Sequence, residues 1–117
     1  MDTITYQDFA KVAIRMGVVK SAEVPEGSEK VIKLIVDFGP PEVGFSGGER
    51  TIFAGIKQWY TPEELIGRQL PFMVNLEPKK MGNLGYSQGM LMAVVMEDGR
   101  PVLLKPDLEV KAGDKVI

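Results

Sequence analysis

The stretch of the chain best suited to chemistry is residues 75–91, NLEPKKMGNLGYSQGML. It places the adjacent Lys79 and Lys80, three glycines, a serine and two methionines between apolar runs. A lysine ammonium can neutralise a phosphate of a nucleic acid, and binding of this kind weakens as salt rises. The alternative is a solvated loop whose two lysines contact only water.

The amino-acid composition gives little support for a catalytic function. The chain has no cysteine and no histidine, which excludes a disulfide framework, thiolate metal sites, and Ser-His-Asp or Cys-His mechanisms. The carboxylate pairs Glu63–Glu64 and Glu97–Asp98 suit a helix N-terminus and a tight turn, respectively. No group of acids has the spacing of metal ligands. We therefore expect a non-catalytic protein with no cofactor and no metal.

Charge is segregated along the chain, although the formal net charge is only −2. Every charged residue between positions 11 and 20 is basic, whereas acids gather at residues 23–29 and toward the C-terminal end. This distribution favours a basic face on an otherwise acidic body.

The length of 117 residues predicts one domain, residues 1–117, with a single core. No apolar run approaches the ~20 residues of a membrane-spanning helix. The opening MDTITYQDF lacks the basic and then apolar pattern of a secretory signal. We expect a cytoplasmic protein that does not enter a membrane.

Hydrophobic periodicity predicts mostly strands, with one short helix after Thr5 as cap and another capped by Thr61. Gly17 is expected to form a bend or bulge in the first strand. Alternation in the second strand predicts that Ile32, Leu34 and Val36 share one face. The main strands are expected at residues 12–24, 30–38, 50–56, 68–75 and 87–96, a hairpin turn at 97–100, and two short strands within 101–106 and 114–117.

Five main strands with a helix (61–67) between the third and fourth predict an all-β, five-stranded OB-fold Greek-key barrel with short helices and a C-terminal extension. Such barrels bind oligonucleotides across strands two and three, with the help of the loops between strands 1 and 2 and between strands 4 and 5. These loops fall here at residues 24–30 and 76–86. The second loop contains Lys79 and Lys80.

Four segments carry a resemblance to a known family over nearly the whole chain. They are DFAKVAIRMGVVKSAEVPEGSEKVIKLIVDFG, TIFAGIKQWYTPEELIGRQLPFMVNLEPKKM, SQGMLMA and LLKPDLEVKAGDKV. Together they resemble the tRNA-binding domain of the EMAP II and methionyl-tRNA-synthetase type.

Two places depart from the family pattern. Residues 39–49 form a longer connection than usual, which can alter the edge of the binding face, and residues 82–86 run about one residue long.

The resemblance implies an OB-fold that binds tRNA by shape, usually as a homodimer built partly from the C-terminal segment. Family members are free-standing tRNA-binding proteins, the C-terminal part or β subunit of methionyl-tRNA synthetase, and CsaA-type export chaperones. This chain has the length expected of a free-standing protein or a β subunit, with the synthetase catalytic chain as a candidate partner. The alternative is a chaperone that binds unfolded polypeptide with the same face.

The resemblance also suggests which residues contact RNA. Lys79 and Lys80 are expected to bind phosphates, and the S-x-G-M positions Ser87, Gln88 and Met90 to contact sugar or bases, although core packing is an equal alternative for Met90.

Four further positions complete the candidate site. Lys33 is expected on the outward face of the second strand, and Lys30 at the end of the loop before it. Arg15 is expected outward on the first strand, free for RNA or paired with an acid such as Asp37. Asn75 is included as a residue that shapes the loop more than it touches RNA.

Overall fold

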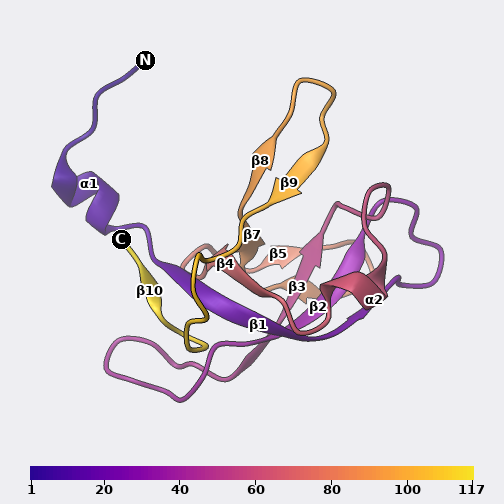
Figure 1. Cartoon of the computed structure of the whole chain (residues 1–117), viewed down its shortest axis with the longest axis horizontal. Coiled ribbons are helices and arrows are strands. Elements are labelled where there is room, and N and C mark those ends of the chain that lie inside the picture. The colour runs from indigo at the N-terminus through magenta and orange to yellow at the C-terminus, as the bar shows by residue number, and fades with distance from the viewer.

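The barrel is organised around one long strand, β1 (Ile14–Glu23), in a computed structural model that describes residues 1–117. The first half of β1 pairs with β4 (Gln69–Met73) and its second half with β2 (Ile32–Asp37). β3 (Glu49–Ala54) continues the sheet beside β2, and β7 (Met90–Leu91) beside β4. All of these pairings are antiparallel, and β1 runs through the middle of the molecule (Figure 1).

The segment that precedes β7 nearly closes the barrel against β3. The Gln88 backbone N–H donates to the Thr51 carbonyl at 2.8 Å, and the Thr51 N–H donates to the Gln88 side-chain oxygen at 2.9 Å. The Ser87 hydroxyl accepts from the Phe53 N–H at 3.0 Å. The result is a nearly closed, five-stranded antiparallel barrel, which confirms the predicted OB-type fold class.

The core fills the barrel from alternate positions of its strands. Ile32, Leu34 and Val36 of β2 are fully buried, as the alternation predicted, and so is Phe38 just after them. The Phe38 ring meets the Phe72 ring edge-to-face, with 5.5 Å between centroids.

The prediction that Gly17 forms a bend or bulge was wrong. The register of β1 against β2 shifts between Val19 and Ser21 instead. Gly17 is needed for space: a Cβ atom there would lie 2.3 Å from Val36 Cγ1 and 2.9 Å from Phe38 Cε1.

Replacing Gly17 by alanine is therefore expected to overpack the core. The added methyl group must displace the side chains of Val36 and Phe38, at a cost of about 1–3 kcal/mol of folding free energy. Urea denaturation followed by far-UV circular dichroism measures the loss. Gly55→Ala is the matched control, because the nearest atom to its added Cβ is a backbone oxygen 4.0 Å away. Equal stability of the two variants would contradict this account of Gly17.

Both predicted helices form, and each begins at its expected cap. α1 (Tyr6–Ala10) is capped by Thr5, whose hydroxyl accepts from the Asp8 N–H. α2 (Pro62–Leu65) follows Thr61, whose N–H and hydroxyl both donate to the Glu64 carboxylate. These two hydrogen bonds are the main reason that the pKa of Glu64 lies below its ordinary value. Neither helix has the length or apolar character to span a membrane.

The predicted fifth strand, residues 87–96, is wrong as a single element. β7 contributes two residues beside β4, and the chain then leaves the barrel as β8 (Ala93–Val95), which pairs with β9 (Pro101–Leu103) in a projecting hairpin (Figure 1). The predicted turn at 97–100 joins these two strands, with Met96 N–H donating to the Arg100 carbonyl. A continuous apolar run does not reveal where a strand changes partner.

The C-terminal extension crosses the outer face of β1 and β4 and ends as a strand. The Gln69 side chain holds it by accepting from the Val110 N–H and donating to the Val110 carbonyl. Met16 bonds to its backbone on both sides, to Gly113 and Asp114. β10 (Lys115–Val116) then pairs with the start of β1.

Candidate nucleic-acid interface

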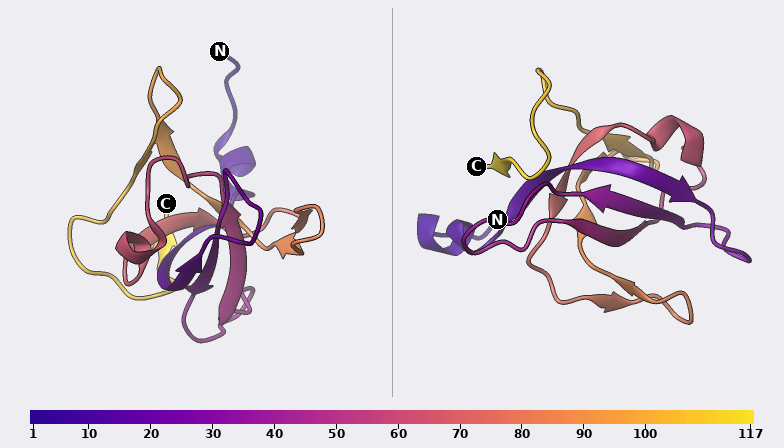
Figure 2. Two further views of the ribbon diagram at one scale, coloured as in Figure 1. Left: turned by 90° about the vertical axis from the view of Figure 1, so that its right-hand side faces the viewer. Right: turned by 90° about the horizontal axis from the view of Figure 1, so that it is seen from below.

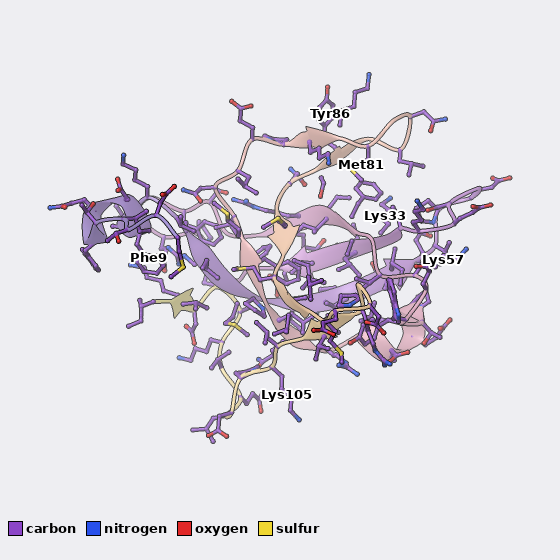
Figure 3. The ribbon with its side chains drawn as sticks, turned by 90° about the horizontal axis from the view of Figure 1, so that it is seen from above. Phe9, Lys33, Lys57, Met81, Tyr86 and Lys105 are labelled. Atoms are coloured by element: carbon purple, nitrogen blue, oxygen red, sulfur yellow. The ribbon has the colours of Figure 1, made fainter.

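The predicted loop at residues 76–86 contains a two-stranded hairpin. β5 (Lys79–Lys80) pairs with β6 (Tyr86–Ser87), and the turn is closed by Met81 N–H donating to the Gly85 carbonyl at 2.8 Å. Figure 3 shows Met81 and Tyr86 on the same side of the barrel as Lys33 of β2. The hairpin and the C-terminal extension lie on opposite sides of the barrel (Figure 2, right).

Lys79 and Lys80 are exposed at the base of this hairpin. Neither takes part in any of the four ion pairs of the chain. Their ammonium groups are therefore available to an external anion.

The other two predicted lysines lie on or beside β2. Lys33 faces outward, as expected, and is half-buried with its ammonium 3.7 Å from the Glu23 carboxylate. Lys30 is exposed just before the strand, and its carbonyl accepts from the Lys57 N–H. Lys33 must exchange or share its acidic partner to contact RNA, whereas Lys30 has no side-chain partner in the chain.

The S-x-G-M residues divide between structure and surface. Ser87 is buried, and its hydroxyl accepts from Phe53 and donates to the Gly89 carbonyl at 3.1 Å. Gln88 uses its side-chain oxygen on Thr51, which leaves its amide N–H groups free. Met90 is 47% exposed, so its side chain is outside the core. Gln88 and Met90 can reach a ligand, while Ser87 holds β3 against the hairpin.

Replacing Ser87 by alanine is expected to cost stability. The change leaves the buried Phe53 N–H without an acceptor, a loss of about 1–3 kcal/mol. Chemical denaturation measures it, and Ser46→Ala serves as the control because the Ser46 hydroxyl has no partner in the chain and is exposed. If Ser87→Ala instead reduced ligand binding with stability unchanged, the hydroxyl would contact the ligand directly.

The expectation that Arg15 faces outward was wrong. Residues 15, 17 and 19 of β1 share the inward face, and Arg15 is only 8% exposed. Its guanidinium lies 4.4 Å from the centroid of the Phe45 ring and donates to Glu42 at 2.5 Å and to the Gly113 carbonyl at 3.0 Å. The acid that pairs with it is thus Glu42 rather than Asp37.

Asn75 fixes the start of the segment that leads to the hairpin. Its side-chain oxygen accepts from the Ala13 N–H at 2.9 Å, and its amide donates to the Lys11 carbonyl at 2.6 Å. Both contacts tie this segment to the residues before β1. They are the contacts of a residue that shapes the loop.

Arg50 was not identified from the sequence. Its guanidinium lies over the rings of Phe38 and Phe45, with the guanidinium carbon 5.7 and 5.2 Å from their respective centroids. One guanidinium nitrogen donates to the carbonyls of Val74 and Gln88 at 2.7 and 3.2 Å. Burial lowers the pKa of Arg50, and no carboxylate pairs with it. No local sequence signal marks this residue, because the carbonyls that hold its guanidinium belong to residues 24 and 38 positions away in the chain.

The long connection at residues 39–49 is anchored to the barrel. Phe45 packs edge-to-face on Phe38, with centroids 6.0 Å apart, and Glu42 bonds to Arg15. This connection is therefore attached to the barrel at two points before it reaches Arg50.

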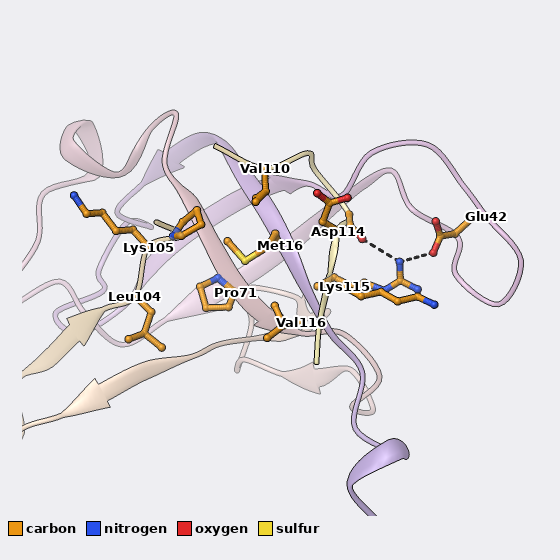
Figure 4. Close-up of a pocket in the computed structure, with 12 residues that line it drawn as sticks. Met16, Glu42, Pro71, Leu104, Lys105, Val110, Asp114, Lys115 and Val116 are labelled. Atoms are coloured by element: carbon orange, nitrogen blue, oxygen red, sulfur yellow. Dashed lines mark hydrogen bonds and ion pairs between the residues drawn. The ribbon is translucent and has the colours of Figure 1, made fainter. Parts of the chain in front are cut away.

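A groove lies elsewhere, between the C-terminal extension and the outer face of β1 and β4 (Figure 4). Met16, Pro71, Leu104 and Val116 supply apolar lining, and the Arg15–Glu42 pair lies at one end. This groove is separate from the hairpin of residues 79–87.

Comparison with known proteins gives consistent results. Residues 14–115 match the model of a family described as a putative tRNA binding domain. The crystal structure of a MetRS-related protein from Pyrococcus horikoshii is similar, with 41% identity, a TM-score of 0.88 and full coverage of both chains. The chaperone CsaA from Bacillus anthracis str. Ames is 33% identical, with a TM-score of 0.83 and 99% and 100% coverage of this chain and of that chain. The CsaA chaperone protein from Picrophilus torridus is 32% identical, with the same TM-score and 98% and 100% coverage.

Proposed function

The chain belongs to the family of putative tRNA-binding domains, and from that premise we propose that it is a non-catalytic, cytoplasmic module that binds tRNA by shape and backbone charge. The family match over residues 14–115 is the observation that carries this proposal. The 41% identical relative is described as MetRS-related, which supports a role as a free-standing tRNA-binding protein or as a β subunit beside a methionyl-tRNA synthetase catalytic chain.

The hairpin of residues 79–87 provides the electrostatic part of this function. Lys79 and Lys80 are exposed and unpaired, so each can replace a counterion on an RNA phosphate without first giving up a partner. Met90 is exposed next to the hairpin and offers a polarizable contact to a base or sugar. Phosphate contacts of this type position a protein on RNA without reading its sequence.

The proposal includes a homodimer, because the β8–β9 hairpin exposes apolar side chains that a second copy could bury. Val95 and Met96 are 71% and 50% exposed near the tip of the β8–β9 hairpin, and Val94, on the opposite face from Val95, is 50% exposed. An isolated two-stranded hairpin is marginally stable in water. A second copy packed on this hairpin and on the groove of Figure 4 would bury both apolar surfaces.

A chaperone function is the second candidate. It is favoured by the similarity to two proteins described as CsaA chaperones and by the same exposed apolar hairpin, which could contact unfolded polypeptide. The identity to these proteins is lower than to the MetRS-related protein, so tRNA binding remains the first proposal.

Titration of the whole chain with unfractionated tRNA tests the proposal. Filter binding at about 50 mM salt is expected to show saturable binding that weakens steeply as salt rises. A base-paired RNA hairpin of equal charge should compete poorly if shape is recognised. Absence of tRNA binding at low salt would overturn the proposal. Suppression of aggregation of an unfolded protein at stoichiometric ratios, with tRNA unable to compete, would support the chaperone instead.

A further inference from the structure

A small polar pocket lies where the 39–49 connection, the start of β3 and the segment before the hairpin meet. Its polar lining comes from Ser46, Gly47, Glu49, Arg50 and Gln88. Leu76 and Pro78 complete it on the side toward the hairpin. Pro78 directly precedes Lys79, so the pocket adjoins the exposed lysine pair.

The pocket is rich in hydrogen-bond donors that the chain itself leaves unused. Only one guanidinium nitrogen of Arg50 has acceptors, the carbonyls of Val74 and Gln88. The remaining Arg50 N–H groups, the Gln88 amide, the Ser46 hydroxyl and the Gly47 backbone N–H have no acceptor within the chain.

The position of Arg50 is fixed before any ligand arrives. Its guanidinium lies within 6 Å of two ring centroids, those of Phe38 and Phe45, and is held by two carbonyls. A guanidinium that is held in place, partly removed from water and unpaired with a carboxylate is well suited to a tetrahedral oxyanion, because its planar fork matches two phosphate oxygens.

We propose that this pocket, formed by Arg50, Gln88, Ser46 and Gly47, binds one phosphate of the RNA backbone. The inference rests on the proposed tRNA-binding function and extends it to a specific subsite. An RNA strand that places phosphates on Lys79 and Lys80 would reach this pocket across Pro78. The two lysines and the pocket would then bind phosphates of the same strand. Glu49 is the single carboxylate in the lining, and it opposes the phosphate without pairing with Arg50.

Two charge variants test the pocket in opposite directions. Arg50→Gln is expected to weaken tRNA binding about fivefold and to make the negative slope of log K against log[salt] shallower by about 0.7–0.9, the value of one phosphate contact. Glu49→Gln is expected to tighten binding about two- to threefold, because it removes the opposing charge. Glu97→Gln, at the turn of the β8–β9 hairpin, makes the same charge change away from the pocket and should leave affinity nearly unchanged.

The salt slope distinguishes a phosphate contact from a structural role. If Arg50 only clamps the carbonyls of Val74 and Gln88, its loss can weaken binding but leaves the slope at the wild-type value, and Glu49→Gln then behaves like Glu97→Gln. Either result overturns the pocket while the proposed function stands. Because Glu49 is exposed, its variant is informative even if Arg50→Gln folds poorly.

A direct probe separates the pocket from the proposed function. Titration of the ¹⁵N-labelled chain with inorganic phosphate is expected to shift the Gly47 amide and the Arg50 Nε–H resonances together, with Arg50→Gln abolishing the Gly47 shift. If wild-type protein shows this phosphate response but does not bind tRNA, the RNA function is rejected. The pocket would then bind a phosphate that does not belong to an RNA backbone. No phosphate response and an unchanged salt slope would reject the pocket alone.

Discussion

Replacing both Lys79 and Lys80 by alanine is expected to weaken tRNA binding about 30-fold at physiological salt and to make the negative slope of log K against log[salt] shallower by about 1.4–1.8. Each exposed ammonium that binds a phosphate releases one condensed counterion, and the entropy of that release is lost with the side chain. Because neither lysine has a partner in the chain, the folded state should be as stable as the wild type. Fluorescence anisotropy across a salt series measures the affinity and the slope together.

The matched control is the double variant Lys105→Ala and Lys111→Ala. Both lysines are exposed on the C-terminal extension, across the barrel from the hairpin, as Figure 3 shows for Lys105. Lys105 also lines the groove of Figure 4, so gel filtration first checks that this variant keeps the oligomeric state of the wild type. Each double variant changes the formal net charge from −2 to −4, so a general charge effect would weaken binding equally in both. Equal losses would mean that the hairpin holds no specific phosphate contacts.

Replacing Phe38 by alanine is expected to destabilise the protein by about 3–5 kcal/mol, a large share of the ~5–15 kcal/mol typical of a domain. The ring is fully buried and contacts the rings of both Phe72 and Phe45 edge-to-face. Its removal leaves a cavity at the place where the 39–49 connection is attached to the barrel. Urea denaturation should show a lower midpoint. The dependence of the unfolding free energy on urea concentration, which reports the surface exposed on unfolding, should change little.

The surface variant Val43→Ala provides the comparison for this stability measurement. Val43 lies in the same connection and is fully exposed, so its truncation should change stability by less than about 0.5 kcal/mol. A loss below about 1 kcal/mol for Phe38→Ala would contradict a core in which the three rings pack as one unit. Because Arg50 lies over the rings of Phe38 and Phe45, Phe38→Ala should also reduce RNA affinity.

Features set by local sequence could be predicted well. The alternation in β2 predicted its buried face, and Thr5 and Thr61 marked the starts of both helices. The number of strands and the helix between the third and fourth were enough to predict the barrel, which the structure confirms. In each case the signal lies within a few neighbouring residues, where periodicity and capping act.

Features set by distant partners could not be predicted. Arg15 was predicted to face outward because β-strand alternation defines two faces of a strand but does not say which face is inside at the end of a barrel. Its inward position depends on Phe45 and Glu42, both from the 39–49 connection. Arg50 was missed for the same reason. The RNA contacts assigned to Lys79, Lys80, Gln88 and Met90 remain predictions.

The pairing of β10 with β1 has a consequence for the order in which the chain can fold. Ile14 and Val116 are partners, yet the ribosome makes them about 100 residues apart, so this contact forms only late in synthesis. Until then the start of β1 has β4 on one side and an unpaired edge on the other, and the outer face of Met16 is uncovered. An unpaired edge beside an apolar patch is prone to association with other nascent chains. The nascent protein is thus most vulnerable at its first strand, in the interval before its final strand emerges.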